Sequence, residues 1–119
     1  MFESLRKRKY PYIKDQILND GLAYAMEFGE NWLQPIQSRL TKLYPELTED
    51  ELNYYNKTCR EAMDIGHALV YDLVEKFGKE DSSKKFTSDF MATYPWINKK
   101  NLDHLYSQGR YYAWKDFGY

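Results

Sequence analysis

The stretch Leu47–Gly78, LTEDELNYYNKTCREAMDIGHALVYDLVEKFG, decides the fold. Thr48 is a favourable N-cap, and Glu51 stands three residues later, where its carboxylate can reach back to the Thr48 amide. At the other end, Gly78 can adopt the left-handed conformation that ends many helices. Between these ends, apolar residues recur at steps of three and four. The sequence therefore predicts one long amphipathic helix over residues 49–77.

The segment before this helix carries the same helical periodicity, interrupted by Pro35. A proline inside a helix removes one backbone hydrogen bond and clashes with the preceding turn. We therefore expect two helices, at about residues 12–29 and 33–44. A single helix kinked at Pro35 is the alternative.

The segment after Gly78 begins with the polar run KEDSSKK at residues 79–85, which predicts a connection without regular structure. A shorter helix near 83–93 and a last helix near 99–116, capped by Asn98, are expected to follow. No alternating β pattern is present. The predicted fold class is all-α, a compact bundle of four or five helices around the long central helix.

One pattern occurs three times: a Tyr-Pro dipeptide, one residue of any type, an aliphatic residue and, five residues after that aliphatic, a leucine. The dipeptides are Tyr10-Pro11, Tyr44-Pro45 and Tyr94-Pro95. In each case the proline ends any preceding helix, and the aliphatic residue and the leucine can pack against each other across the start of the next helix. The second and third copies lie 50 residues apart, which is consistent with a duplicated helical hairpin or with convergent helix-start chemistry.

Composition indicates a globular protein rather than a disordered one, with 119 residues that we interpret as a single domain. Residues 1–10 include the basic run Arg6–Lys9, an N-terminal arm that we expect to be solvated and partly frayed rather than bound to nucleic acid or lipid. The 17 basic and 18 acidic residues nearly cancel, so a nucleic-acid partner is not expected. There is no secretory leader, no apolar run of about 20 residues and only one cysteine, which together predict a soluble cytoplasmic protein without a membrane span.

The middle of the central helix carries the small residues Cys59, Ala62 and Gly66. Small residues let a neighbouring helix approach closely, and Gly109 of the last helix is the expected partner. Because glycine inside a helix costs about 1 kcal/mol relative to alanine, a packing or functional reason is expected for it. Tight packing is the favoured interpretation, and a ligand slot is the alternative.

His67 is the most distinctive polar residue of this helix, with Asp64 three residues before it and Tyr71 four residues after it. Together with Cys59 they form the candidate ligand-binding set. Two alternatives exist for His67: a mononuclear metal site with Asp64, His104 and a further carboxylate, or a structural hydrogen bond. The hydrogen bond is favoured. We assign no metal ligands, and the sequence identifies no cofactor.

Enzyme motifs are absent from the sequence. There is no nucleophile elbow, no glycine-rich phosphate loop and no duplicated Glu-x-x-His pattern. Cys59 lies three turns into its helix, far from the positive end that would favour a thiolate. Catalysis is therefore not the leading hypothesis.

Aromatic residues make up 18% of the chain, including 12 tyrosines. In the last helix they point in several directions, because consecutive helical residues are about 100° apart, so one buried face cannot hold them all. The candidate interface residues are Tyr111, Tyr112, Trp114, Phe117 and Trp96. We predict an interaction or regulatory module that binds another protein or itself as a homodimer. The alternative is a helical bundle, or an enzyme built on one, that binds a metal or small ligand near His67 and Asp64.

Overall fold

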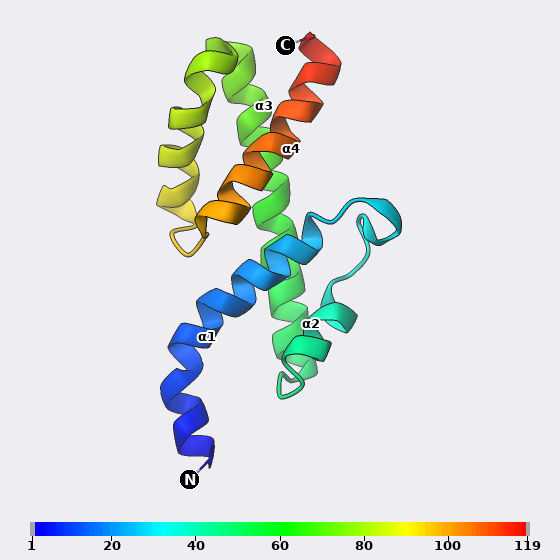
Figure 1. The fold of residues 1–119 in the computed structure, drawn as a ribbon, viewed down its shortest axis with the longest axis vertical. Coiled ribbons are helices and arrows are strands. Elements are labelled where there is room, and N and C mark those ends of the chain that lie inside the picture. Colours follow the sequence, from blue (N-terminus) through cyan, green and yellow to red (C-terminus); the bar gives the residue numbers. More distant parts are fainter. Residues whose placement is uncertain (1, 119) are drawn as a thin grey trace. The chain divides into compact units, whose positions relative to one another are not determined.

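A computed structural model describes residues 2–118 of the chain, and the side chains of residues 14–78 and 80–118. This part is all-α, as predicted, and contains no strand. Its elements in order are α1 (Phe2–Ala25), the short 3-10 helix η1 (Gly29–Asn31), α2 (Gln37–Leu43), α3 (Glu49–Thr93) and α4 (Lys99–Phe117) (Figure 1).

The central helix α3 begins as predicted. The Glu51 amide donates to Thr48 Oγ1 at 3.1 Å and the Thr48 amide donates to Glu51 Oε1 at 2.9 Å, so both halves of the capping box form. Gly78 is its single non-helical residue, with φ 77° and ψ 174°, and divides α3 into residues 49–77 and 79–93. The first of these segments is the predicted central helix.

The chain divides into two compact units, Met1–Cys59 and Arg60–Tyr119, which we call unit 1 and unit 2. The single-domain organisation stays a prediction. The helical segment 49–77 is continuous through the boundary between Cys59 and Arg60.

Unit 1 packs α1, α2 and the first turns of α3 around one apolar core. Gly21 of α1 lies close against α3, since a Cβ placed there would lie 2.7 Å from Cys59 Sγ. The Arg39 guanidinium holds the connection after α1, donating to the Tyr24 carbonyl at 2.9 Å and to the Gln34 carbonyl at 3.1 Å. The buried apolar residues are Ile17, Leu18, Leu22, Ala25, Met26, Ile36, Leu40, Leu47, Tyr55 and Cys59.

Pro35 separates two helices, as predicted, but their bounds differ from the expected 12–29 and 33–44. Gly29 and Leu33 have left-handed φ values of 85° and 65°, which interrupt helical conformation between Ala25 and Gln37. At its other end α1 begins at Phe2, so the Tyr-Pro of residues 10–11 lies inside the helix instead of starting it. The backbone of the predicted arm therefore belongs to α1, while its side chains lie outside the described ones.

Unit 2 packs residues 60–77, residues 79–93 and α4 together. Its two helical glycines, Gly66 and Gly109, were expected to face each other, and they do not. Gly66 receives the side chain of Leu105, and Gly109 receives that of Val70, so each glycine forms a hole for a side chain of the other helix. The favoured interpretation of close packing is correct, and the expected glycine partner is wrong.

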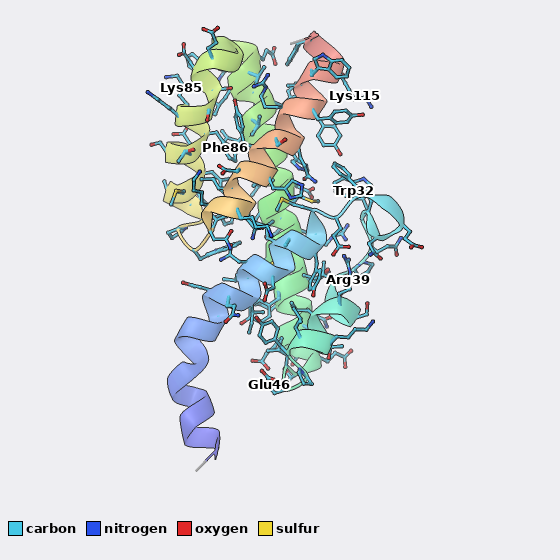
Figure 2. The ribbon with its side chains drawn as sticks, viewed as in Figure 1. Trp32, Arg39, Glu46, Lys85, Phe86 and Lys115 are labelled. Atoms are coloured by element: carbon cyan, nitrogen blue, oxygen red, sulfur yellow. The ribbon has the colours of Figure 1, made fainter. Side chains whose placement is uncertain are left out.

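Residues 79–85 are helical, so the predicted polar connection is also wrong. Gly78 alone reverses the chain. Ser82 is fully buried, and its Oγ lies 2.6 Å from the hydroxyl of Tyr106 on α4. Phe86, one turn further on, points into the interior of unit 2 and stacks on Phe90 (Figure 2).

The two later Tyr-Pro segments have the same backbone geometry. In each, the tyrosine amide donates to the carbonyl four residues before it, the tyrosine carbonyl accepts from the aliphatic amide, and the cap carbonyl accepts from the leucine amide. The distances are 2.9, 3.1 and 2.9 Å for the segment at Tyr44 and 2.9, 3.2 and 2.9 Å for the segment at Tyr94. Apart from η1, each unit also has two α-helical segments before its Tyr-Pro dipeptide and one after it, which favours the duplication hypothesis.

Candidate functional site

His67 is half-buried in unit 2, where α3 meets α4. Its Nε2 lies 2.9 Å from Gln108 Oε1, and Gln108 Nε2 lies 3.5 Å from Nε2 of His104. Its ring also packs on Tyr112, with centroids 5.2 Å apart. The predicted structural hydrogen bond of His67 thus has Gln108 as its partner.

Burial lowers the pKa of His67, because it disfavours the imidazolium more than the Gln108 hydrogen bond and the Asp64 charge favour it. The imidazole is therefore neutral at neutral pH and donates its Nε2 proton to Gln108 Oε1. The side-chain amide of Gln108 then donates from its Nε2 to Nε2 of His104, so Gln108 links the two histidines.

The four candidate ligand residues do not share one site. Tyr71 donates its hydroxyl proton to Asp116 at 2.6 Å. Asp64 is exposed, and Cys59 is buried in unit 1 against α1. Among the side chains that the structure describes, no three metal-ligating groups converge.

Cys59 is poorly suited to nucleophilic chemistry. Its thiol donates to the Leu18 carbonyl at 3.4 Å. Burial raises its pKa to about 12, so the thiol stays protonated at neutral pH. It acts as a small apolar group that fits against Gly21.

The five candidate interface residues separate into two classes. Tyr112 packs on His67, Phe117 packs on Tyr71 with centroids 4.9 Å apart, and Trp96 is half-buried beside Tyr94. Tyr111 and Trp114 instead keep 50% and 57% of their surface exposed. Their ring centroids lie 6.3 Å apart with an interplanar angle of 29°.

These two rings lie in an exposed stripe along α4, which we call the α4 surface. The Lys115 ammonium lies 5.7 Å from the Tyr111 ring centroid, and Figure 2 shows Lys115 on the outer side of the helix. The neighbouring acids are engaged elsewhere, since Asp103 pairs with Lys99 at 2.9 Å and Asp116 accepts from Tyr71. The α4 surface comprises Lys100, His104, Ser107, Tyr111, Trp114 and Lys115.

A second exposed stripe, on α3 of unit 2, was missed in the sequence. We call it the α3 ridge. It comprises Glu61, Asp64, Ile65, Ala68, Asp72 and Glu75, all exposed. The 3.6-residue period places them on one helix face, so the sequence contains the signal, but polar exposed positions on a helix do not by themselves indicate a binding surface. Gln108 was missed because a buried polar residue has no periodic signal of its own.

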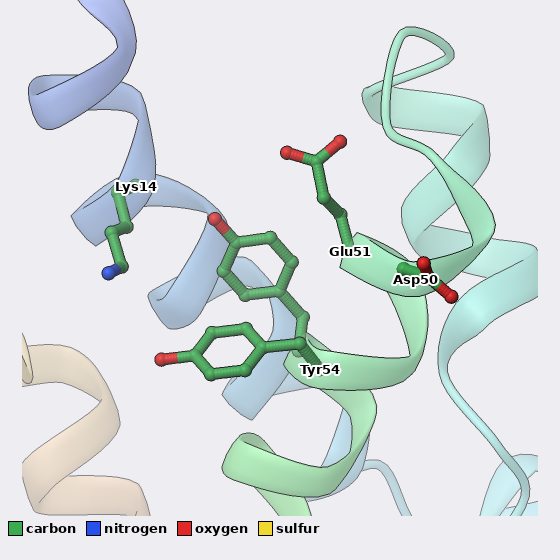
Figure 3. A pocket seen from close by; sticks show the side chains of 5 residues that line it. Lys14, Asp50, Glu51 and Tyr54 are labelled. Atoms are coloured by element: carbon green, nitrogen blue, oxygen red, sulfur yellow. The ribbon is translucent and has the colours of Figure 1, made fainter.

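Unit 1 has a hollow of about 360 Å³ lined by Lys14, Asp50, Glu51, Tyr54 and Tyr55 (Figure 3). The Lys14 ammonium lies 5.8 Å from the Tyr54 ring centroid. Glu51 already accepts from the Thr48 amide, so this carboxylate has a structural role in the helix start.

Comparison with known proteins finds no matching family model, no matching curated protein and no matching solved structure. Within residues 2–118, no helix has the length and apolar content needed to cross a bilayer.

Proposed function

We propose that this protein is a soluble intracellular interaction module, and that its α4 surface binds a helix of a partner protein carrying carboxylates beside apolar side chains. The observation that carries the proposal is the exposure of Tyr111 and Trp114 on the same helix face. Aromatic residues of this kind dominate the binding energy of many protein interfaces.

The aromatic pair supplies the apolar part of the contact. Roughly half of each ring's surface is exposed, which is about 75–125 Å² on typical side-chain areas. At about 25 cal/mol per Å², covering each ring contributes about 2–3 kcal/mol before the entropy of association is subtracted.

The charges around the rings select the partner. Lys100 and Lys115 make no ion pair within the described residues, and the acids beside them are engaged elsewhere. An acidic partner helix would complement these ammonium groups, which mainly increases the rate and specificity of association. The alternative of a metal or ligand site at His67 ranks second, because its Nε2 is bonded to Gln108 and no metal-ligand set surrounds it among the side chains that the structure describes.

The test is photo-cross-linking of the full chain in cells of its native source. A benzophenone amino acid replaces Trp114. In a matched control it replaces Met91, an exposed apolar residue of the helical segment 79–93. We expect one discrete adduct at position 114, on an acidic helix, that disappears with Lys115→Glu. An absent adduct, or the same adduct from position 91, would contradict the proposal.

A further inference from the structure

The α3 ridge has the charge that the α4 surface lacks. Four of its six residues are carboxylates, Glu61, Asp64, Asp72 and Glu75, and none forms an ion pair within the described residues. Between them lies Ile65, which keeps 49% of its surface exposed. The ridge is therefore an acidic and apolar helix face of the kind that the α4 surface requires.

The two stripes also match in length and order. At about 1.5 Å per residue, the rise from Glu61 to Glu75 is about 21 Å and the rise from Lys100 to Lys115 is about 22 Å. If the helices run antiparallel, one register places unlike charges together at both ends and Tyr111 opposite Ile65 between them. The pairs are Lys115 with Glu61, Tyr111 with Ile65, Ser107 with Ala68, His104 with Asp72, and Lys100 with Glu75.

Within unit 2, these two helical segments run in the same direction (Figure 1). Their contacts show this in sequence order, since Gly66 meets Leu105 and Val70 meets Gly109. A two-fold axis perpendicular to both helices reverses the direction of the second copy. It therefore sets the α3 ridge of each copy antiparallel to the α4 surface of the other, and both contacts form at once.

We propose that the partner of the α4 surface is a second copy of this chain, bound as a two-fold dimer through reciprocal contacts between the α3 ridge and the α4 surface. This inference rests on the proposed function and names its partner. Two short helix pairs form a small interface, and such interfaces are typically weak and transient. The ion pairs are at the rim, so salt weakens the dimer.

Sedimentation of the purified full chain over a concentration series tests the inference. We expect dimers that dissociate as the salt concentration rises. Reversing both lysines with Lys100→Glu and Lys115→Glu, or both acids with Glu61→Lys and Glu75→Lys, should raise the dimer dissociation constant at least about tenfold, because like charges then face each other. Mixing these two variants should restore a dimer of one copy of each.

The control variant carries Lys42→Glu and Lys84→Glu at exposed positions outside both stripes. It changes the net charge by the same amount as the lysine reversal and should dimerise as the wild type does. Circular dichroism confirms that each variant is folded. A wild-type chain that stays monomeric at about millimolar concentration, or reversed variants that fail to pair when mixed, would overturn the inference. If the chain is monomeric yet position 114 cross-links to a different protein, the proposed function survives and only the second copy is excluded.

Discussion

Gly109→Ala tests the close packing inside unit 2. The added Cβ would lie 2.5 Å from Val70 Cβ and 2.9 Å from both of its methyl carbons. Val70 is fully buried, and its Cβ is attached directly to the backbone, so rotation of the side chain cannot relieve the contact. The two helices must separate, so we expect a cost in the upper part of the usual range for overpacking, about 2–3 kcal/mol.

Helix propensity opposes this cost, because alanine is favoured over glycine by about 1 kcal/mol in a helix interior. We expect a net loss of about 1–2 kcal/mol in the free energy of unfolding. For a chain of this size, that loss lowers Tm by roughly 4–8 °C.

Urea denaturation followed by circular dichroism measures the loss, with Ser88→Ala as the control at an exposed helical position of the same unit, outside both stripes. The double variant Val70→Ala with Gly109→Ala should be more stable than the two single effects predict, by about 1 kcal/mol, because the smaller side chain makes room for the new methyl group. The packing argument would be refuted if Gly109→Ala were as stable as the wild type or more so. It would also be refuted if the stability losses of the two single variants summed to the loss of the double variant.

Three further outcomes follow from the hydrogen bonds and burial. The free energy of unfolding should decrease as the pH falls below 6.5, the ordinary pKa of histidine, because folding lowers the pKa of His67 and the unfolded chain then binds more protons. His67→Gln should flatten this decrease, and a variant with the pH profile of the wild type would contradict the prediction. Cys59 should react with a thiol reagent only as fast as the protein unfolds, whereas the denatured chain reacts at once; rapid labelling of the folded protein would contradict the burial of Cys59. Thr48→Ala and Asn98→Ala should each cost about 1 kcal/mol in chemical denaturation, since each removes a side chain that accepts from an amide at a helix start, and negligible costs would argue against both caps.

Local signals made the all-α class and the central helix predictable. The capping box at Thr48 and the left-handed Gly78 depend only on nearby residues, so their effect could be deduced without a structure. The helix over residues 79–85 could not, because its anchoring contact joins Ser82 to Tyr106, which is distant in sequence. The start of α2 likewise depends on a remote residue, since Asn56 Oδ1 accepts from the Ile36 amide at 3.1 Å.

The candidate site was predictable only as a set of residues. The sequence indicated an aromatic last helix, but the exposure of each ring depends on what α3 places beside it. Tyr112 packs on His67 and Phe117 packs on Tyr71, whereas Tyr111 and Trp114 remain exposed. Gln108 escaped notice because its role appears only when both histidines are placed.

The continuity of residues 49–77 through the boundary of the two units has a consequence for how the chain folds. The slow step in making a helix is nucleation of its first turn, after which each added residue forms its hydrogen bond readily. During synthesis, residues 49–59 can dock on α1 before unit 2 is complete. The docked turns would then serve as a preformed nucleus from which the first helix of unit 2 elongates.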